Sequence, residues 1–320
     1  MSERVAIIGQ GYVGLPLAMA ALGAGHTVYG IDNDGGRVDL LLSGQSPVAD
    51  VADGEIAKHL GDTYFVGTGY GVVADCSIVI VCVPTPLDEQ GKPDISYLIK
   101  AVDGVAGVMS DGSLLIIEST IEPGTIREVI APKVSGVEVV YSPERIDPGN
   151  KTWTVKNTPK LVAGLSKAGG DKAAAFYSTF ISDVRVLSSV EVIETAKLLE
   201  NSFRLVNISF INEISIFCDA MGIDVQEVIA AASSKPYGFM PFYPSAGVGG
   251  HCIPVDPVYL AHKAQMVGAP IASIDTALDI NQKMIEHYLW KSVEKIGDLR
   301  GKKVLIVGIA YKPGVADVRE

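Results

Sequence analysis

The sequence predicts an α/β protein that begins with a doubly wound parallel sheet and continues into an all-helical middle part. Three observations predict it. Short runs rich in Val and Ile alternate with helical segments over the first third of the chain, a long stretch without Pro or Gly follows, and one more apolar run stands near the end. Runs that are apolar at almost every position are typical of strands buried on both faces of a parallel sheet. Their alternation with helices predicts that helices cover both faces.

The first part is expected to hold the strands of one sheet with helices between them. The residues from Tyr97 to Met109 place apolar side chains three and four positions apart, which indicates one of these helices. The expected strands are Val5–Ile8, Thr27–Ile31, Ser77–Val83, Leu114–Ile117 and Val137–Tyr141.

The middle part is expected to be helical from about Val190. The stretch Val190–Met221 predicts one long helix, and Asp224–Ala232 and Ile274–Ile296 predict two more. Ser233–Pro257 is rich in Pro, Gly and aromatic residues, and a loop of this length is usually functional or disordered. The run Lys303–Val307 predicts the first strand of a second Rossmann-like domain. The expected domains are residues 1–189, 190–299 and 300–320, the last being the beginning of a truncated domain.

The composition argues against several classes of function. Hydrophobic residues make up 48% and charged residues 20%, as in ordinary soluble globular proteins. The net charge of −11 argues against a nucleic-acid or anionic-membrane partner, since both need a basic face. The chain has no membrane-length apolar run and no signal-peptide layout, and its four cysteines form no CxxC pair. We therefore expect a cytoplasmic protein without a disulfide framework or a metal site.

A glycine motif, Gly9-Gln10-Gly11-Tyr12-Val13-Gly14, follows an expected strand and opens a helix. This is the context that the dinucleotide fingerprint GxGxxG of a Rossmann-type domain requires. The first glycine permits the tight turn, the second lets the pyrophosphate approach the backbone, and the third permits close packing of helix on strand. Free N–H groups at the helix N-terminus would bind the pyrophosphate. The alternative, a glycine-rich turn without a cofactor, does not account for this strand, motif and helix together.

The identity of the dinucleotide is predicted by Asp32, which ends the second expected strand. A carboxylate at this point accepts hydrogen bonds from the ribose hydroxyls and repels a 2′-phosphate, which predicts NAD rather than NADP. Arg37 is expected near the adenosine or its phosphates.

A second dense motif runs from Gly247 to Asp256. Its glycines would let a ligand approach the backbone, and Pro254 would stiffen the other side. Cys252, expected in this loop outside any regular element, is either a nucleophile or a buried small apolar residue, and the local sequence leaves both open. His251 is a weaker candidate for its base, because adjacent residues in extended backbone point to opposite sides.

Lys197 and Asn201 are four residues apart on the expected long helix and so share one face. Taken alone, the pair is as readily a solvated surface feature as part of a site. Its meaning depends on the motifs elsewhere in the chain.

Several segments together resemble the UDP-glucose/GDP-mannose dehydrogenase family, in order and spacing, over essentially the whole chain. Within the family, the chain is most similar to the UDP-N-acetylglucosamine 6-dehydrogenases, on the segments 142–150, 235–244 and 250–254. Members acting on UDP-glucose and GDP-mannose tend to have Ser instead of His before the cysteine. The segments that carry the resemblance are Gly9–Pro16, Val83–Pro86, Glu118–Thr120, Ser142–Arg145, Lys197–Asn201 and the loop around Cys252.

The resemblance implies an NAD-dependent enzyme that oxidises the C6 hydroxyl of a UDP-sugar, best UDP-N-acetylglucosamine, to the uronic acid in two hydride transfers. Cys252 would attack the intermediate aldehyde to give a thiohemiacetal, and a second oxidation would give a thioester that water hydrolyses. Lys197 would stabilise the developing oxyanion, and Asn201 would orient the sugar or the oxyanion. The resemblance also implies a homodimer built on the central helix.

The remaining roles follow from the same resemblance. Asp256 and Thr120 would position the hydrolytic water, and Glu144 would be the general acid–base partner near C6. Thr85 and Thr120 would also contact the cofactor near the nicotinamide. The substrate site would consist of Glu144, Lys197, Asn201, Tyr243, Ser245, Gly247, Gly249 and Lys312.

Two departures from the family pattern limit what is carried over. Pro236 stands about where UDP-glucose members carry an Arg that reaches across the dimer, so that role is left out. Family members continue into a C-terminal domain that binds UDP, and residues 308–320 resemble its opening. The alternatives are UDP-glucose or UDP-N-acetylmannosamine as substrate, a two-electron hydroxyacid dehydrogenase without a nucleophilic cysteine, and an inactive fragment that only binds NAD.

Overall fold

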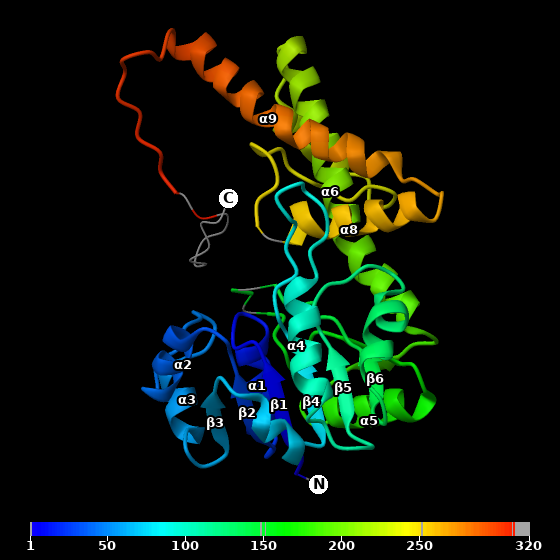
Figure 1. Cartoon of the computed structure of the whole chain (residues 1–320). Coiled ribbons are helices and arrows are strands. Elements are labelled where there is room, and N and C mark those ends of the chain that lie inside the picture. The colour runs from blue at the N-terminus through cyan, green and yellow to red at the C-terminus, as the bar shows by residue number, and fades with distance from the viewer. Residues whose placement is uncertain (1, 148, 151, 251, 309, 311–320) are drawn as a thin grey trace. The chain divides into compact units, whose positions relative to one another are not determined.

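The computed structural model describes residues 2–147, 149–150, 152–250, 252–308 and 310. The chain forms two compact units, of which the first extends to Lys197 and the second starts at Leu198. Figure 1 shows the labelled strands in the first unit and long helices in the second. No helix among the described residues combines the length and the apolar character that crossing a bilayer needs.

The first unit is built on an eight-stranded sheet. In chain order its strands are β1 (Arg4–Ile8), β2 (Thr27–Ile31), β3 (Tyr64–Gly67), β4 (Ile78–Val81), β5 (Leu114–Ile117), β6 (Glu138–Tyr141), β7 (Lys160–Gly164) and β8 (Val184–Val186). Their order across the sheet is β3-β2-β1-β4-β5-β6-β7-β8. The strands β1 to β6 pair in parallel, whereas β7 is antiparallel to β6 and parallel to β8.

The order of the strands reverses between β1 and β4, which are neighbours in the sheet but not in the chain. At such a reversal the loops after the two strands separate, and ligands bind in the crevice outside the carboxyl ends of the strands. The loop after β1 is the glycine motif, so the topology places it where a dinucleotide binds. The predicted fold class is confirmed, and the five predicted strands are β1, β2, β4, β5 and β6.

Helices pack on both faces of the sheet and bury alternate residues of its strands. On one face, Val5 and Ile7 of β1 belong to a buried apolar cluster with residues of α1 and α5. On the other face, Ala6 and Ile8 belong to a second cluster with residues of α4. The helices of the first unit are α1 (Gly14–Gly23), α2 (Gly35–Leu42), α3 (Asp53–His59), α4 (Ser96–Ala106) and α5 (Lys167–Tyr177).

The second unit is helical, with a core formed by Leu205, Ala261, Ile274 and Ala277. Its longest helix begins within the first unit, and its first and last residues, Val190 and Met221, are the predicted ones. The helices are α6 (Val190–Met221), α7 (Val225–Ser233), α8 (Cys252–Met266) and α9 (Ala272–Ile296).

The structure corrects the predicted loop Ser233–Pro257, because α8 already begins at Cys252. Cys252 is therefore the first residue of a helix rather than part of an irregular loop. Pro254 lies in the first turn, where the backbone N–H groups have no partner within the helix, so its missing N–H costs nothing there. Pro257 lies further inside α8. These two prolines are what favoured a loop in the sequence.

The strand predicted at Lys303–Val307 is absent from the described part of the chain. Val304 to Val307 carry no regular structure and are 67% to 87% exposed. A strand needs a neighbouring strand to accept and donate its backbone hydrogen bonds, and no described strand lies beside this run.

Candidate active site

The glycine motif after β1 has the shape that a dinucleotide needs. Gly9 has φ +91°, and a Cβ there would come 2.6 Å from the carbonyl oxygen of Cys82. A Cβ on Gly14 would come 1.8 Å from the carbonyl oxygen of Gly9. By contrast, a Cβ on Gly11 would have nothing within 4 Å. Two glycines thus make the turn possible, and the third leaves open the space above the backbone that a pyrophosphate would use.

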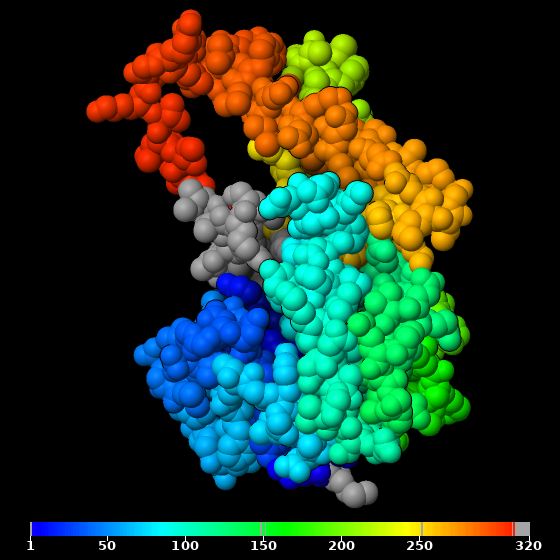
Figure 2. All heavy atoms as spheres, in the orientation of Figure 1, coloured from blue at the N-terminus to red at the C-terminus, as the bar shows by residue number. Residues whose placement is uncertain are grey.

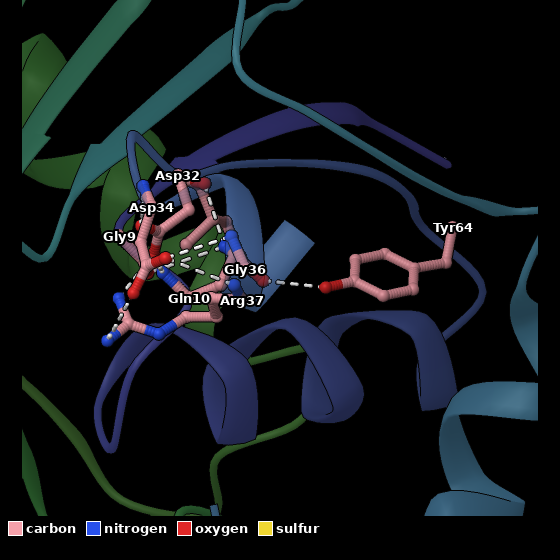
Figure 3. Close-up of polar contacts among 8 residues, drawn as sticks. Gly9, Gln10, Asp32, Asp34, Gly36, Arg37 and Tyr64 are labelled. Carbon is pink, nitrogen blue, oxygen red and sulfur yellow. Dashed lines mark hydrogen bonds and ion pairs between the residues drawn. The ribbon is translucent and has the colours of Figure 1, made fainter. Parts of the chain in front are cut away.

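Asp32 is buried directly after β2, and three hydrogen bonds hold its carboxylate beside the glycine motif (Figure 3). Its Oδ2 accepts from the backbone N–H of Gln10 at 2.7 Å and from Nη1 of Arg37 at 2.9 Å, and its Oδ1 accepts from the N–H of Asp34 at 3.0 Å. Nη2 of Arg37 also lies 3.8 Å from Oδ2 of Asp34. The carboxylate is therefore fixed in place, with a guanidinium beside it.

The side chain of Gln10 anchors the glycine motif to β1 and to β3, a role that the sequence alone did not indicate. Its Nε2 donates to the Ile7 carbonyl at 2.8 Å, and its Oε1 accepts from the Tyr64 hydroxyl at 2.7 Å (Figure 3). Burial raises the pKa of Tyr64 far above its usual value, so the hydroxyl stays a donor. A Cβ on Gly30 would lie 2.8 Å from Gln10, so β2 carries a glycine there to make room.

Replacing Asp32 by Asn is expected to lower the affinity for NADH about tenfold and to improve NADPH binding relative to NADH. The amide accepts fewer hydrogen bonds from the ribose, no longer repels a 2′-phosphate, and frees Arg37 to bind one. Titration calorimetry with both nucleotides measures the change. Asp34→Asn, which alters the cap of α2 instead, is the control. An unchanged ratio of the two affinities in Asp32→Asn would show that Asp32 does not select the nucleotide.

A buried cluster of charges lies at the carboxyl ends of β5 and β6. Nζ of Lys160, on β7, lies 2.9 Å from Oε2 of Glu118 and 3.6 Å from Oε2 of Glu144, and it contacts the Pro143 carbonyl at 3.4 Å. The hydroxyl of Tyr177, at the end of α5, donates to Oε1 of Glu118. Glu144, the predicted acid–base residue, is thus held by a cation from β7 that the sequence did not indicate.

Burial and the neighbouring charges set the pKa values in this cluster. Burial raises the pKa of Glu118 to about 6, although Lys160 beside it acts in the opposite direction. Burial alone would lower the pKa of Lys160, but the carboxylates of Glu118 and Glu144 raise it. The ammonium therefore persists inside the protein. Oε1 of Glu144 also accepts from the N–H groups of Arg145 and Ile146, each at 2.6 Å.

Replacing Glu118 by Gln is expected to remove part of the pH dependence of stability. The folded pKa of about 6 lies above the value of 4.5 for an unfolded Glu, so Glu118 stabilises the fold below pH 4.5 and loses that contribution as the pH rises to 6. The loss amounts to about 2 kcal/mol. Urea unfolding at pH 4.5 and 6.5 should show this difference between wild type and Glu118→Gln. If the free energy of unfolding changed equally with pH in both proteins, the raised pKa of Glu118 would be contradicted.

The second unit brings together three of the predicted residues. Cys252 is exposed at the first residue of α8, which rules out the alternative of a buried small apolar side chain. Asp256 is buried and lies four residues further along α8, so the two share a face of the helix. Nδ2 of Asn201, on α6, donates to Oδ2 of Asp256 at 2.7 Å. The partial positive charge at a helix N-terminus stabilises a thiolate.

The other predicted residues occupy the following places. Lys197 is buried on α6, one turn before Asn201, and belongs to the first unit. Thr85 is buried and Thr120 is half-buried in the first unit. In the second unit, Tyr243 is exposed, and Ser245, Gly247 and Gly249 are half-buried in the segment before α8. His251 and Lys312 lie outside the described residues.

Comparisons with known proteins show the family of this chain. Residues 3–181 match the NAD binding domain of the UDP-glucose/GDP-mannose dehydrogenase family, and residues 191–283 match its central domain. The chain is 37% identical to a UDP-N-acetyl-D-glucosamine 6-dehydrogenase of Pseudomonas aeruginosa, over 99% of this chain and 77% of that protein. It is 30% identical to a UDP-N-acetyl-D-mannosamine dehydrogenase of Campylobacter jejuni, over 99% of this chain and 81% of that protein.

A solved structure, the UDP-N-acetyl-mannosamine dehydrogenase Cap5O from Staphylococcus aureus, superposes with a TM-score of 0.86 at 29% identity, over 99% of this chain and 76% of that one. The family matches decide against a hydroxyacid dehydrogenase. The chain belongs to the UDP-glucose/GDP-mannose dehydrogenase family, and its cofactor is NAD.

Proposed function

We propose that this chain oxidises the C6 hydroxyl of UDP-N-acetylglucosamine to the carboxylate and consumes two NAD per sugar. The observation that carries the proposal is the exposed Cys252 at the start of α8, one turn from a buried Asp256 that accepts a hydrogen bond from Asn201. A dehydrogenase that removes only two electrons needs no nucleophile. An exposed thiol beside an ordered carboxylate is what a four-electron oxidation requires.

The reaction divides into two oxidations and one hydrolysis. The first removes a hydride from C6 and a proton from its hydroxyl, which leaves an aldehyde. The Cys252 sulfur then adds to C6, and loss of a second hydride and of the hydroxyl proton turns the adduct into a thioester. Water attacks the thioester carbonyl, the C–S bond breaks, and the carboxylate and the free thiol result. NAD, when bound, accepts each hydride.

The side chains around these atoms have separate tasks in the proposal. Lys197 stabilises the oxyanion that forms on addition to C6, and Asn201 orients the sugar and holds Asp256. Asp256 takes a proton from the hydrolytic water, which Thr120 helps to position. Glu144, held by Lys160, acts as the acid–base group near C6.

Recognition of the cofactor and of the sugar nucleotide is assigned to separate segments. Thr85 contacts the cofactor near the nicotinamide, and the residues from Tyr243 to Gly249 line the sugar nucleotide. Residues 300–320 begin a further domain, in which Lys312 contacts the UDP. The choice of sugar rests on the higher identity to the UDP-N-acetyl-D-glucosamine enzyme, 37% against 30% for the mannosamine enzyme.

Counting NADH against sugar consumed tests the proposal. The chain is mixed with NAD and UDP-N-acetylglucosamine, with UDP-N-acetylmannosamine and UDP-glucose in parallel. Two NADH per UDP-N-acetylglucosamine are expected, at the highest kcat/KM of the three sugars. One NADH per sugar would overturn the thioester route, and a preference for another sugar would overturn only the substrate. Binding of NAD without turnover of any sugar would favour the inactive fragment.

We also propose a homodimer through α6. Exposed apolar side chains recur along this helix at spacings of four and seven residues, which places them in one stripe. Figure 2 shows the C-terminal end of α6 (yellow-green) open at the surface beside α9 (orange). The stripe consists of Leu199, Phe203, Phe210, Phe217 and Met221, which are 47% to 61% exposed.

Replacing Phe210 and Phe217 together by Glu is expected to convert the dimer to a monomer, because four buried charges would face one another across a two-fold interface. Light scattering after size-exclusion chromatography measures the mass. Arg204→Glu, on another face of α6, should leave the mass unchanged. A wild-type mass equal to that of a single chain would remove the proposal.

A further inference from the structure

A row of buried amide and hydroxyl groups connects the segment before α8 to α6 and α9. The backbone N–H of Ser245 donates to Oδ1 of Asn212, on α6, at 2.9 Å. Nδ2 of Asn212 donates to Oδ1 of Asn281, on α9, at 3.2 Å, and Nδ2 of Asn281 donates to Oγ of Ser209 at 2.6 Å and to the Ala277 carbonyl at 2.9 Å. Asn212 is 0% exposed, so no water can replace these partners.

The row has one direction, which its chemistry imposes. The carbonyl of Ala277 can only accept, so the amide nitrogen of Asn281 must face it, and the amide oxygen must face Asn212. That oxygen in turn draws the nitrogen of Asn212 toward itself and leaves Oδ1 of Asn212 directed at Ser245. The Ala277 carbonyl thus orients the amide of Asn281, which orients the amide of Asn212, whose oxygen accepts from the N–H of Ser245.

The same segment is restrained at a second point. Oγ of Ser245 donates to the carbonyl of Gly247 at 2.6 Å, which closes a tight turn. Gly247 has φ +113°, a conformation that strains any residue with a Cβ. A Cβ there would also lie 3.3 Å from the backbone oxygen of Asn281. The turn therefore lies against α9 as well as being held by α6.

We propose that Asn212 and Asn281 are positioning residues for the sugar nucleotide, which they do not touch: they hold the turn from Ser245 to Gly247 in its binding conformation before the ligand arrives. The inference rests on the proposed function, which assigns this segment to the sugar nucleotide. A loop that is ordered in advance does not lose its conformational freedom on binding, so the effect falls on affinity. In this proposal the two amides contact only the protein and not C6, so the rate of the chemical steps should stay unchanged.

The test compares Asn212→Ala with Asn207→Ala, a control on the same helix whose amide donates to the Phe203 carbonyl one turn earlier. Hydrogen exchange of the Ser245 amide and steady-state kinetics with UDP-N-acetylglucosamine are measured in both. Asn212→Ala should speed exchange and raise KM, each about tenfold, with kcat nearly unchanged. Asn207→Ala should change neither.

A third variant separates positioning from general loss of structure. Asn212→Asp keeps an oxygen toward Ser245, and its protonated carboxyl can donate to Oδ1 of Asn281 in place of the amide. At a pH low enough to protonate that carboxyl, the exchange rate and KM should return toward the wild-type values. A purely structural role predicts that both substitutions behave alike.

Unchanged exchange in a folded Asn212→Ala protein would overturn the inference, as would faster exchange with an unchanged KM. If the wild type turns over no sugar, calorimetric titration with UDP-N-acetylglucosamine replaces KM. If it binds none, the proposed function fails, and with it the assignment of this turn to the sugar nucleotide, while the exchange rates still report whether Asn212 holds it.

Discussion

Replacing Cys252 by Ala is expected to lower the rate of NADH formation from the UDP-sugar by at least about 10³-fold, because the step that captures the aldehyde has no substitute. The thiol is exposed at the beginning of α8, so removing it leaves no cavity in the core. The melting temperature and the affinity for NAD should therefore stay at the wild-type values. A coupled measurement of NADH and of residual sugar gives both rate and stoichiometry.

Cys218→Ala is the matched control, because Cys218 is a buried thiol in the same unit. It should lose a little stability and keep two NADH per sugar. If Cys252→Ala still released two NADH per sugar at a rate near that of the wild type, no thioester on Cys252 could lie on the pathway. A loss of NAD binding in Cys252→Ala would instead mean that the substitution had damaged the fold.

Replacing Gly14 by Ala is expected to disrupt the first unit and with it the binding of NAD. The new Cβ would lie 1.8 Å from the carbonyl oxygen of Gly9 and 3.0 Å from its carbon. Both atoms belong to the backbone of the turn, so the start of α1 must move away from β1. Overpacking a core side chain costs about 1–3 kcal/mol, and a clash with backbone should cost at least that much. Thermal unfolding and NADH fluorescence measure the two effects.

Two other glycines of this region, Gly11 and Gly23, serve as comparisons. Gly11→Ala meets nothing within 4 Å, so it should fold like the wild type but bind NAD less tightly, because its methyl group occupies the space above the turn. Gly23→Ala, at the end of α1, also has open space and should alter neither property. Normal folding and NAD binding in Gly14→Ala would show that the turn relaxes more easily than its geometry indicates.

The parts of the fold that sequence predicts well are those in which local pattern and final environment agree. The central strands β4 and β5 consist entirely of Val, Leu and Ile because both of their faces are covered. By contrast, β7 begins with Lys160, a residue that is buried only because Glu118 and Glu144 lie beside it. Its strand character depends on partners that no local pattern reveals.

The candidate site divides in the same way. The glycine motif and Asp32 are predictable because a short segment carries the whole geometry of the turn. The cluster of Glu118, Lys160 and Tyr177 is assembled from β5, β7 and α5, and it exists only because β7 enters the sheet antiparallel to β6. Its members look unremarkable one at a time in the sequence. The start of α8 was missed because prolines usually end helices, whereas here one lies in the first turn.

The exposure of Cys252 also predicts sensitivity to oxidants, if this thiol is the nucleophile proposed above. Cys76 and Cys218 are buried, and burial raises the pKa of Cys76 to about 11, which keeps that sulfur in its unreactive form. An exposed thiol is open to peroxide, which converts it to a sulfenic acid and then, irreversibly, to a sulfinic acid. In the proposed mechanism, brief exposure to peroxide should therefore inactivate the protein in a way that a thiol reductant reverses, and longer exposure should inactivate it permanently.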